Sequence, residues 1–350
     1  MKINLKTANK VTQIYAEAGA LSSLGSIAAE LVKGRRAAIV SDSNVAPLYL
    51  ERAKEVLTAA GFSVGGIVVP AGEASKQPEK VLELWAEFNK LGITRKDVIV
   101  ALGGGVVGDL SGFAAATYLR GCPIIQVPTS LLAMVDSSIG GKTGIDLPFG
   151  KNLAGAFHQP VAVVTDSNML QTLPQNRYTE GMAEVIKYGC ISDASLFEGL
   201  ECGRVSAEEF VARSISIKAG VVERDEFDLG ERMLLNFGHT VGHAIEKNMG
   251  FGGISHGEAV AIGMVIAAKL GVRLGVTPQD VPERIIAVLE RYGLPITTTY
   301  SATELAAAIS SDKKNLANKL HFVLLENIGK GVLYPIEPAA LIDELKAILI

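Results

Sequence analysis

The sequence predicts an α/β domain built on a parallel sheet, followed by a mostly α-helical domain. In the first half, continuously apolar, β-branched runs alternate with helical patterns, which is typical of a parallel sheet covered on both faces. After residue 174 few strand-like runs remain, and helical patterns dominate. A chain of 350 residues is long enough for about two domains. We therefore divide it into domains 1–174 and 175–350.

The hydrophobic pattern places each predicted element. We expect strands at 37–41, 64–69, 98–102, 124–127 and 161–165. Apolar positions near a 3.6-residue period predict helices at 45–60, 78–91, 179–188, 208–222, 235–247, 257–270 and 279–292. Because ligands of such sheets bind at the carboxyl ends of the strands, we expect the loops after the strands to carry a ligand.

Composition argues against several classes of partner. The net charge is −4, the pI is near 5.8, and no run of Lys or Arg exceeds a pair, so nothing indicates a nucleic-acid surface. The three cysteines are scattered and lack CxxC spacing, which indicates a reducing compartment. The amino terminus has no apolar signal region, and the apolar run 259–272 contains Lys269 and is too short to span a membrane. We expect a soluble cytoplasmic protein.

A glycine-rich turn follows the expected strand at 98–102. Gly103, Gly105 and Gly108 fit the G-x-G-x-x-G pattern between a strand and a helix, where backbone N–H groups and the helix dipole can bind phosphate. The alternative is tight packing of the helix on the sheet. Asp42 and Asn44, after an earlier strand, could hold an adenosine ribose.

Three of the five histidines, His239, His243 and His256, fall within 18 residues. Neutral imidazole is a common metal ligand and also titrates near neutral pH, so the cluster predicts a metal site or acid–base chemistry. The i, i+4 spacing of His239 and His243 places both on one helix face, as in a zinc-binding HExxH helix. Lysines and arginines beside glycines and in later helices indicate an anionic, phosphate-bearing substrate.

Several strings resemble the 3-dehydroquinate synthase family nearly from end to end and in order. They are GEASK (72–76), ALGGGVVGDLSGFAAATYLRG (101–121), QVPTSLLAMVDSSIGGKTGID (126–146), GKNLAGAFHQP (150–160), EVIKYG (184–189), SIxIKAGVVERDE (214–226), LNFGHTVGHAIE (235–246) and SHGEAVAIGM (255–264). The resemblance implies an amino-terminal NAD-binding α/β domain and a helical, metal-binding carboxy-terminal domain.

The resemblance also implies an activity. A phosphate lyase of this family converts 3-deoxy-D-arabino-heptulosonate 7-phosphate to 3-dehydroquinate and phosphate, the second step towards chorismate. It does so by transient NAD-dependent oxidation, phosphate elimination, re-reduction and an intramolecular aldol reaction. NAD and one divalent metal ion, zinc or cobalt, are implied cofactors, and a homodimer is the implied assembly. The alternatives are another sugar phosphate cyclase, a metal-dependent glycerol-type dehydrogenase, or a non-catalytic nucleotide-binding protein that kept the fold.

Residue by residue, the resemblance assigns the site in three groups. Glu184, His239 and His256 are implied metal ligands, which leaves His243 for proton handling. The implied substrate set is Arg120, Asp136, Lys142, Asn152, Lys187, Lys218, Arg232, Asn236 and either Lys313 or Lys314. The implied NAD set is Asp42, Asn44, Glu73, Lys76, Gly105, Val106, Val107, Gly108, Asp109, Thr129, Ser130, Lys142, Lys151, Met169, Leu170, Gln171 and Thr172.

The sequence departs from the family pattern at two positions. Ala71 stands where an acidic residue is common, and Asp228 stands where a glutamate is expected. Because its side chain is one methylene shorter, Asp228 is left out of the predicted site.

Overall fold

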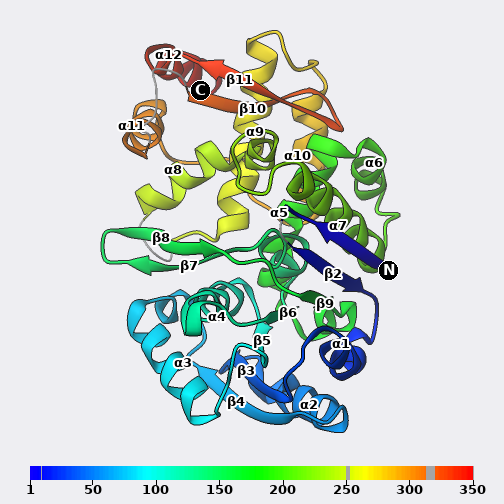
Figure 1. The fold of residues 1–350 in the computed structure, drawn as a ribbon. Helices are drawn as coiled ribbons and strands as arrows, with labels where there is room; N and C mark the ends of the chain where they lie inside the picture. Colours follow the sequence, from blue (N-terminus) through cyan, green and yellow to red (C-terminus); the bar gives the residue numbers. More distant parts are fainter. Residues whose placement is uncertain (9, 250–252, 313–319, 350) are drawn as a thin grey trace. The chain divides into compact units, whose positions relative to one another are not determined.

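A computed structural model describes residues 1–8, 10–249, 253–312 and 320–349. The chain forms two compact units (Figure 1). One contains Met1–Pro174 and Ala207–Phe227, and the other begins with Gln175–Ser206 and resumes at Asp228. The predicted division into 1–174 and 175–350 differs from these units in one segment, residues 207–227, which packs with the first unit.

The first unit is built on a seven-stranded sheet with the order β1-β2-β9-β6-β5-β3-β4. β1 pairs antiparallel with β2, and every other pairing is parallel. The strands are β1 Lys2–Lys6, β2 Val11–Ala16, β3 Arg36–Asp42, β4 Ser63–Val69, β5 Val98–Gly103, β6 Ile124–Pro128 and β9 Ala162–Thr165. The five predicted strands are thus confirmed as β3, β4, β5, β6 and β9.

Helices cover the sheet on both faces. Ala38 and Val40 of β3 belong to the core that also holds residues of α3 and α4. Ala37 and Ile39 of the same strand are buried too. Because successive side chains of a strand point to opposite faces, both faces are covered. The helices of this unit are α1 Leu24–Leu31, α2 Ala46–Ala59, α3 Pro78–Lys90, α4 Gly105–Thr117 and α7 Ala207–Arg224.

A separate antiparallel hairpin, β7 (Lys142–Leu147) and β8 (Gly150–Phe157), belongs to the first unit. Its strand β7 lies against α4, where Gly112 makes room for Thr143: a Cβ at Gly112 would lie 2.3 Å from Thr143 Cγ2. The sequence patterns did not predict this hairpin, nor β1 and β2.

The second unit is mostly helical, as predicted (Figure 1). Its helices are α5 Gln175–Ser192, α6 Ala194–Cys202, α8 His239–Met249, α9 His256–Arg273, α10 Val281–Arg291, α11 Ala302–Asp312 and α12 Pro338–Ile348. An antiparallel pair that the patterns did not predict, β10 (Leu320–Asn327) and β11 (Lys330–Ile336), joins the core formed by α8, α9 and α11. Across the described ranges, the helices lack the length and apolarity that crossing a bilayer requires.

One predicted helix is wrong at its start. The pattern predicted a helix over 235–247, but residues 231–236 form a 3₁₀ segment, and α8 begins only at His239. Gly238 between them has φ +79°, a left-handed conformation that interrupts a right-handed helix. The interruption places His239 at the first turn of α8.

Candidate functional site

Most of the predicted NAD residues lie at one edge of the first unit's sheet. Asp42 ends β3 and Asn44 follows it, 73–76 follows β4, Gly105–Asp109 follows β5, Thr129 and Ser130 follow β6, and 169–172 follows β9. Lys142 and Lys151 lie instead on the hairpin formed by β7 and β8. The strands β3, β4, β5, β6 and β9 are parallel neighbours, so their carboxyl ends share one edge, where ligands of such sheets bind. The side chains of Met169, Leu170 and Val107 are buried, so those positions offer backbone groups there.

The glycine-rich turn has the strand–turn–helix form that phosphate binding requires, and its glycines also pack closely. α4 begins at Gly105, directly after Gly104, so the first N–H groups of the helix lie at the sheet edge. A Cβ at Gly108 would lie 2.9 Å from Gln126 Oε1. The two interpretations, phosphate binding and tight packing, are therefore compatible. Gly108 packs against Gln126 of the sheet, and the first N–H groups of α4 could still bind an anion.

Lys76 links two predicted sets. Its side chain is buried, and its ammonium donates to Asp109 Oδ2 at 2.7 Å and to Asn152 Oδ1. The Asn152 N–H in turn donates to Asp146 Oδ1 at 2.8 Å, and the Asp146 N–H donates to the Lys76 carbonyl at 2.8 Å. Asn152 adopts a left-handed φ of +56° within this network. The loop after β4, the helix α4 and the β7–β8 hairpin are therefore joined at one buried lysine.

Other predicted substrate residues of the first unit lie on separate elements. Lys218 on α7 donates to Asp136 Oδ1 at 2.6 Å and to the Asp136 carbonyl at 2.7 Å. The side chains of Arg120, Lys142 and Lys151 are exposed.

The second unit brings together a buried carboxylate and two histidines. Glu184 of α5, His239 of α8 and His256 of α9 offer ligand atoms that all lie within 4.8 Å of one another. Glu184 Oε1 lies 3.4 Å from His239 Nε2 and 3.7 Å from His256 Nε2. Within the described residues this oxygen is buried and accepts no hydrogen bond. A buried carboxylate oxygen facing two imidazole nitrogens is a donor set that suits a divalent metal ion.

The outer nitrogens of both rings are already engaged. His239 Nδ1 lies 3.1 Å from the Phe237 carbonyl, and His256 Nδ1 lies 3.2 Å from Glu246 Oε2. Metal-binding histidines usually donate their second N–H to a carbonyl or carboxylate, which leaves the other nitrogen as the ligand. Both Nε2 atoms therefore fit the ligand role. Glu246 was not among the predicted residues. It lies on α8, and its contact with His256 of α9 becomes visible only in the folded structure.

Burial and nearby charges act in opposite directions on the pKa values of this group. Burial raises the pKa of Glu184, but the nearby Lys187 ammonium and His239 outweigh it and hold that pKa well below its usual range. Burial lowers the pKa of His239. Burial also lowers the pKa of His256, yet the nearby Glu184 and Glu246 carboxylates raise it to about 10. The pKa of His256 is therefore raised by the same two carboxylates that face its ring nitrogens.

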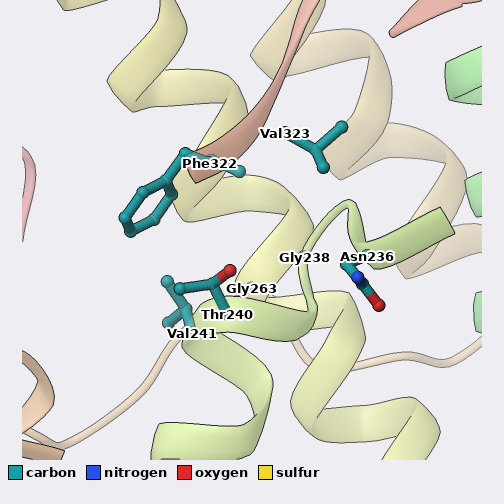
Figure 2. Close-up of a pocket in the computed structure, with 8 residues that line it drawn as sticks. Asn236, Gly238, Thr240, Val241, Gly263, Phe322 and Val323 are labelled. Carbon is teal, nitrogen blue, oxygen red and sulfur yellow. The ribbon is translucent and has the colours of Figure 1, made fainter. Parts of the chain in front are cut away.

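Close glycine contacts set the geometry of the group. A Cβ at Gly263 of α9 would lie 1.9 Å from the Gly238 carbonyl oxygen, directly before His239. A Cβ at Gly257, directly after His256, would lie 2.1 Å from the Glu180 carbonyl of α5. Figure 2 shows Gly238 and Gly263 at the crossing of the two segments, beside a small pocket that Asn236 also lines. Glycine at these positions lets the three ligand-bearing helices approach closely.

The remaining predicted residues of the second unit surround this group. The Lys187 ammonium donates to the other Glu184 oxygen and lies 4.9 Å from the centre of the Tyr188 ring. His243, one turn after His239, is exposed, and the two ring centres are 5.6 Å apart. Arg232 is buried and Asn236 is exposed in the preceding 3₁₀ segment. Lys313 and Lys314 lie outside the described residues.

Solved structures with this fold define the class of protein. A 2-deoxy-scyllo-inosose synthase, complexed with carbaglucose-6-phosphate, NAD⁺ and Co²⁺, is 28% identical, with 99% of each chain covered and a TM-score of 0.87. A 2-epi-5-epi-valiolone synthase from Streptomyces hygroscopicus, with NAD⁺ and Zn²⁺ bound, is 26% identical over 97% of this chain and 96% of that one, with a TM-score of 0.87. A glycerol dehydrogenase from Schizosaccharomyces pombe shares the fold alone, at 16% identity over 98% and 90% of the two chains and a TM-score of 0.67. The fold is that of the sugar phosphate cyclases.

Sequence comparison narrows this class to one family. Residues 66–180 match the family model described as 3-dehydroquinate synthase N-terminal, and residues 181–315 match 3-dehydroquinate synthase C-terminal. A 3-dehydroquinate synthase from Streptococcus sanguinis is 43% identical over 100% of this chain and 99% of its own length. One from Symbiobacterium thermophilum is 47% identical over 92% and 93%. The chain belongs to the 3-dehydroquinate synthase family.

Proposed function

We propose that the chain converts 3-deoxy-D-arabino-heptulosonate 7-phosphate to 3-dehydroquinate and inorganic phosphate, with NAD and one zinc or cobalt ion as cofactors. The observation that carries this proposal is the buried Glu184 carboxylate beside His239 and His256 in a chain of this family. The relatives named 3-dehydroquinate synthase are 43% and 47% identical, whereas the two cyclases with other names are 28% and 26% identical. That difference favours the dehydroquinate reaction over the alternative cyclase activities.

Glu184, His239 and His256 would hold the metal ion through one carboxylate oxygen and two Nε2 atoms. When bound, such an ion supplies Lewis acidity that lowers the pKa of a substrate hydroxyl. The protein's part is to keep both histidines in the tautomer with free Nε2 atoms, through the Phe237 carbonyl and Glu246. Lys187 holds the second Glu184 oxygen and so fixes the carboxylate plane.

The sheet edge described above would hold NAD, which supplies a reversible hydride acceptor. The N–H groups at the start of α4 would bind its pyrophosphate, as helix amino termini bind anions. The buried Lys76 holds Asp109 of this edge and Asn152 of the hairpin together. The fixed position of Asn152 would orient the substrate towards the cofactor.

Proton handling and phosphate binding fall to the remaining polar residues. His243 is exposed beside Glu184, His239 and His256, so its ring could exchange a proton with a bound substrate. The substrate phosphate is a dianion that positively charged groups bind well. We assign that role to members of the predicted basic set: Arg120, Lys142, Lys187, Lys218, Arg232 and one of Lys313 and Lys314.

The test is incubation of the metal-loaded protein with the heptulosonate phosphate and NAD⁺. Phosphate and dehydroquinate should form in equal amounts, because each substrate molecule loses one phosphate. NADH should not accumulate, because the oxidation is reversed within each turnover. Stoichiometric accumulation of NADH would indicate a dehydrogenase. Phosphate release without dehydroquinate, or no phosphate release, would reject the proposed reaction.

We also propose a cellular location and an assembly for this protein. All three cysteines are free, with Cys122 and Cys190 buried, which supports a reducing compartment and hence the cytoplasm. We also propose a homodimer, on the family resemblance. Analytical ultracentrifugation of the full chain tests it, and a single species at the monomer mass of 36.8 kDa would contradict it.

A further inference from the structure

The two nitrogens of His256 face two different carboxylates. Nε2 lies 3.7 Å from Glu184 Oε1, and Nδ1 lies 3.2 Å from Glu246 Oε2. The other histidine of the group, His239, has its Nδ1 next to a backbone carbonyl, that of Phe237. One ring is therefore oriented by the main chain, and the other by a side chain that can be substituted.

The backbone of His256 is fixed independently of this contact. Ser255 and Glu258 form a capping box at the start of α9, with Ser255 N donating to Glu258 Oε2 at 2.9 Å and Glu258 N donating to Ser255 Oγ at 3.3 Å. The cap sets the position of the His256 Cα, whereas rotation about its side-chain bonds remains open. A contact to the ring is needed to choose which nitrogen faces Glu184.

We propose that Glu246 is a positioning residue for the metal centre, accepting the Nδ1–H of His256 so that its unprotonated Nε2 is presented beside Glu184. The carboxylate selects the tautomer and raises the basicity of the ligand nitrogen, two effects expected of a carboxylate behind a metal-binding histidine. This inference rests on the proposed metal site, but not on the identity of the substrate.

A second arrangement of the same residues predicts a different role. His243, Glu246 and His256 also place ligand atoms within 4.8 Å of one another, and there Glu246 would itself be a ligand. The first arrangement is favoured because Glu184 is fully buried with an oxygen that accepts no hydrogen bond in the described chain. His243, in contrast, is exposed, and Glu246 is partly exposed. A buried carboxylate gains more from a cation than an exposed group that water already solvates.

The test compares Glu246→Gln and Glu246→Ala with the wild-type chain, using Zn²⁺ and Co²⁺ as probes. The matched control is Glu201→Gln, which removes one carboxylate charge from the same unit, at the Arg284 ion pair. The number of bound ions and their affinity are measured by chelator competition, starting from metal-free protein. The absorption spectrum of the Co²⁺ form and the thermal unfolding of each metal-free variant are recorded as well.

We expect one ion per chain in every variant. Glu246→Ala should weaken Zn²⁺ binding by about 10- to 100-fold, the range found when such supporting groups are removed. Glu246→Gln should lose less, because its amide oxygen still accepts the Nδ1–H. The Co²⁺ spectrum should shift in both, and Glu201→Gln should bind both ions like the wild type.

Three results would overturn the inference. The first is an unchanged Zn²⁺ affinity in Glu246→Ala, even if the unfolding temperature of that variant falls. Loss of one of two bound ions would make Glu246 a ligand of a second site. A wild-type chain that binds no ion would reject the metal site as well. Metal binding without phosphate release would reject the proposed reaction only, and leave the role of Glu246 intact.

Discussion

Gly263→Ala is the substitution that most directly tests how the metal centre is built. In an isolated helix this change would be favourable by up to about 1 kcal/mol, because alanine forms helix better than glycine. In the structure the new Cβ would lie 1.9 Å from the Gly238 carbonyl oxygen. Packing therefore opposes helix propensity at this position.

The expected cost follows from the overlap. Real Cβ contacts essentially never fall below 3.0 Å, so the Gly238 oxygen and α9 must separate by roughly 1 Å, as overpacking requires. Gly238 cannot turn away easily, because its φ of +79° is already left-handed and a Cβ built on it would lie 2.6 Å from the Val260 carbonyl oxygen. We expect a loss of about 3 kcal/mol, at the upper end of overpacking costs. His239 follows Gly238 directly, and metal–ligand distances tolerate only about 0.2 Å.

The assay measures unfolding temperature and Zn²⁺ affinity side by side. A loss of 3 kcal/mol should lower the unfolding temperature by about 6 to 12 °C for a domain of this size, and Zn²⁺ affinity should fall by more than about tenfold. Gly220→Ala on α7 is the control, because its Cβ would approach only the end of the Arg224 side chain, at 3.4 Å. If Gly263→Ala unfolds at or above the wild-type temperature and binds Zn²⁺ normally, the close crossing does not position the site.

Three further outcomes are expected. His239→Ala should abolish metal binding while His243→Ala keeps the metal and loses turnover; equal metal loss in both, by elemental analysis, would show that the pair is assigned wrongly. Burial raises the pKa of Asp97, yet hydrogen bonds, led by those from Thr94, outweigh it and lower that pKa. Asp97→Asn should therefore cost about 2 kcal/mol near pH 7. Because the pKa of Asp97 is lowered in the folded state, its contribution to stability is full above the ordinary pKa and is lost as the pH falls through the lowered one. The difference from wild type in denaturant titrations should therefore shrink as the pH falls below about 4, and a pH-independent difference would contradict this. Cys202 alone is exposed, so one thiol per native chain should react with a disulfide reagent at pH 8, and fast reaction of a second thiol would show that the burial is wrong.

The sequence predicted the parallel strands because short apolar, β-branched runs alternate with helical patterns, which is typical of a sheet covered on both faces. It did not predict β7 and β8, since a segment such as GKNLAGAF contains four glycines or alanines and no β-branched residue. β10 was not predicted either, although LHFVLLEN is largely apolar, because the segments around it have helical patterns.

The family resemblance and the spacing of the histidines led to different predictions of the metal ligands. The resemblance named Glu184, His239 and His256 together, whereas spacing alone favoured His239 with His243. Two histidines four residues apart share a helix face, but α8 directs only the first against the buried Glu184. Asp228, left out because glutamate was expected, adopts a left-handed φ of +61°, a conformation that aspartate tolerates better than most residues.

Periodicity and local motifs are properties of neighbouring residues, so the class of fold, the family and a set of candidate site residues could be predicted from the sequence. Which atoms meet depends on how distant segments of the chain pack. Glu184 stands more than fifty residues from His239, and the nitrogen each histidine presents depends on Phe237 and Glu246, whose contacts arise when α8 and α9 cross at Gly238 and Gly263. Spacing along a chain fixes a helix face, whereas the orientation of a ring is set by what packs behind it.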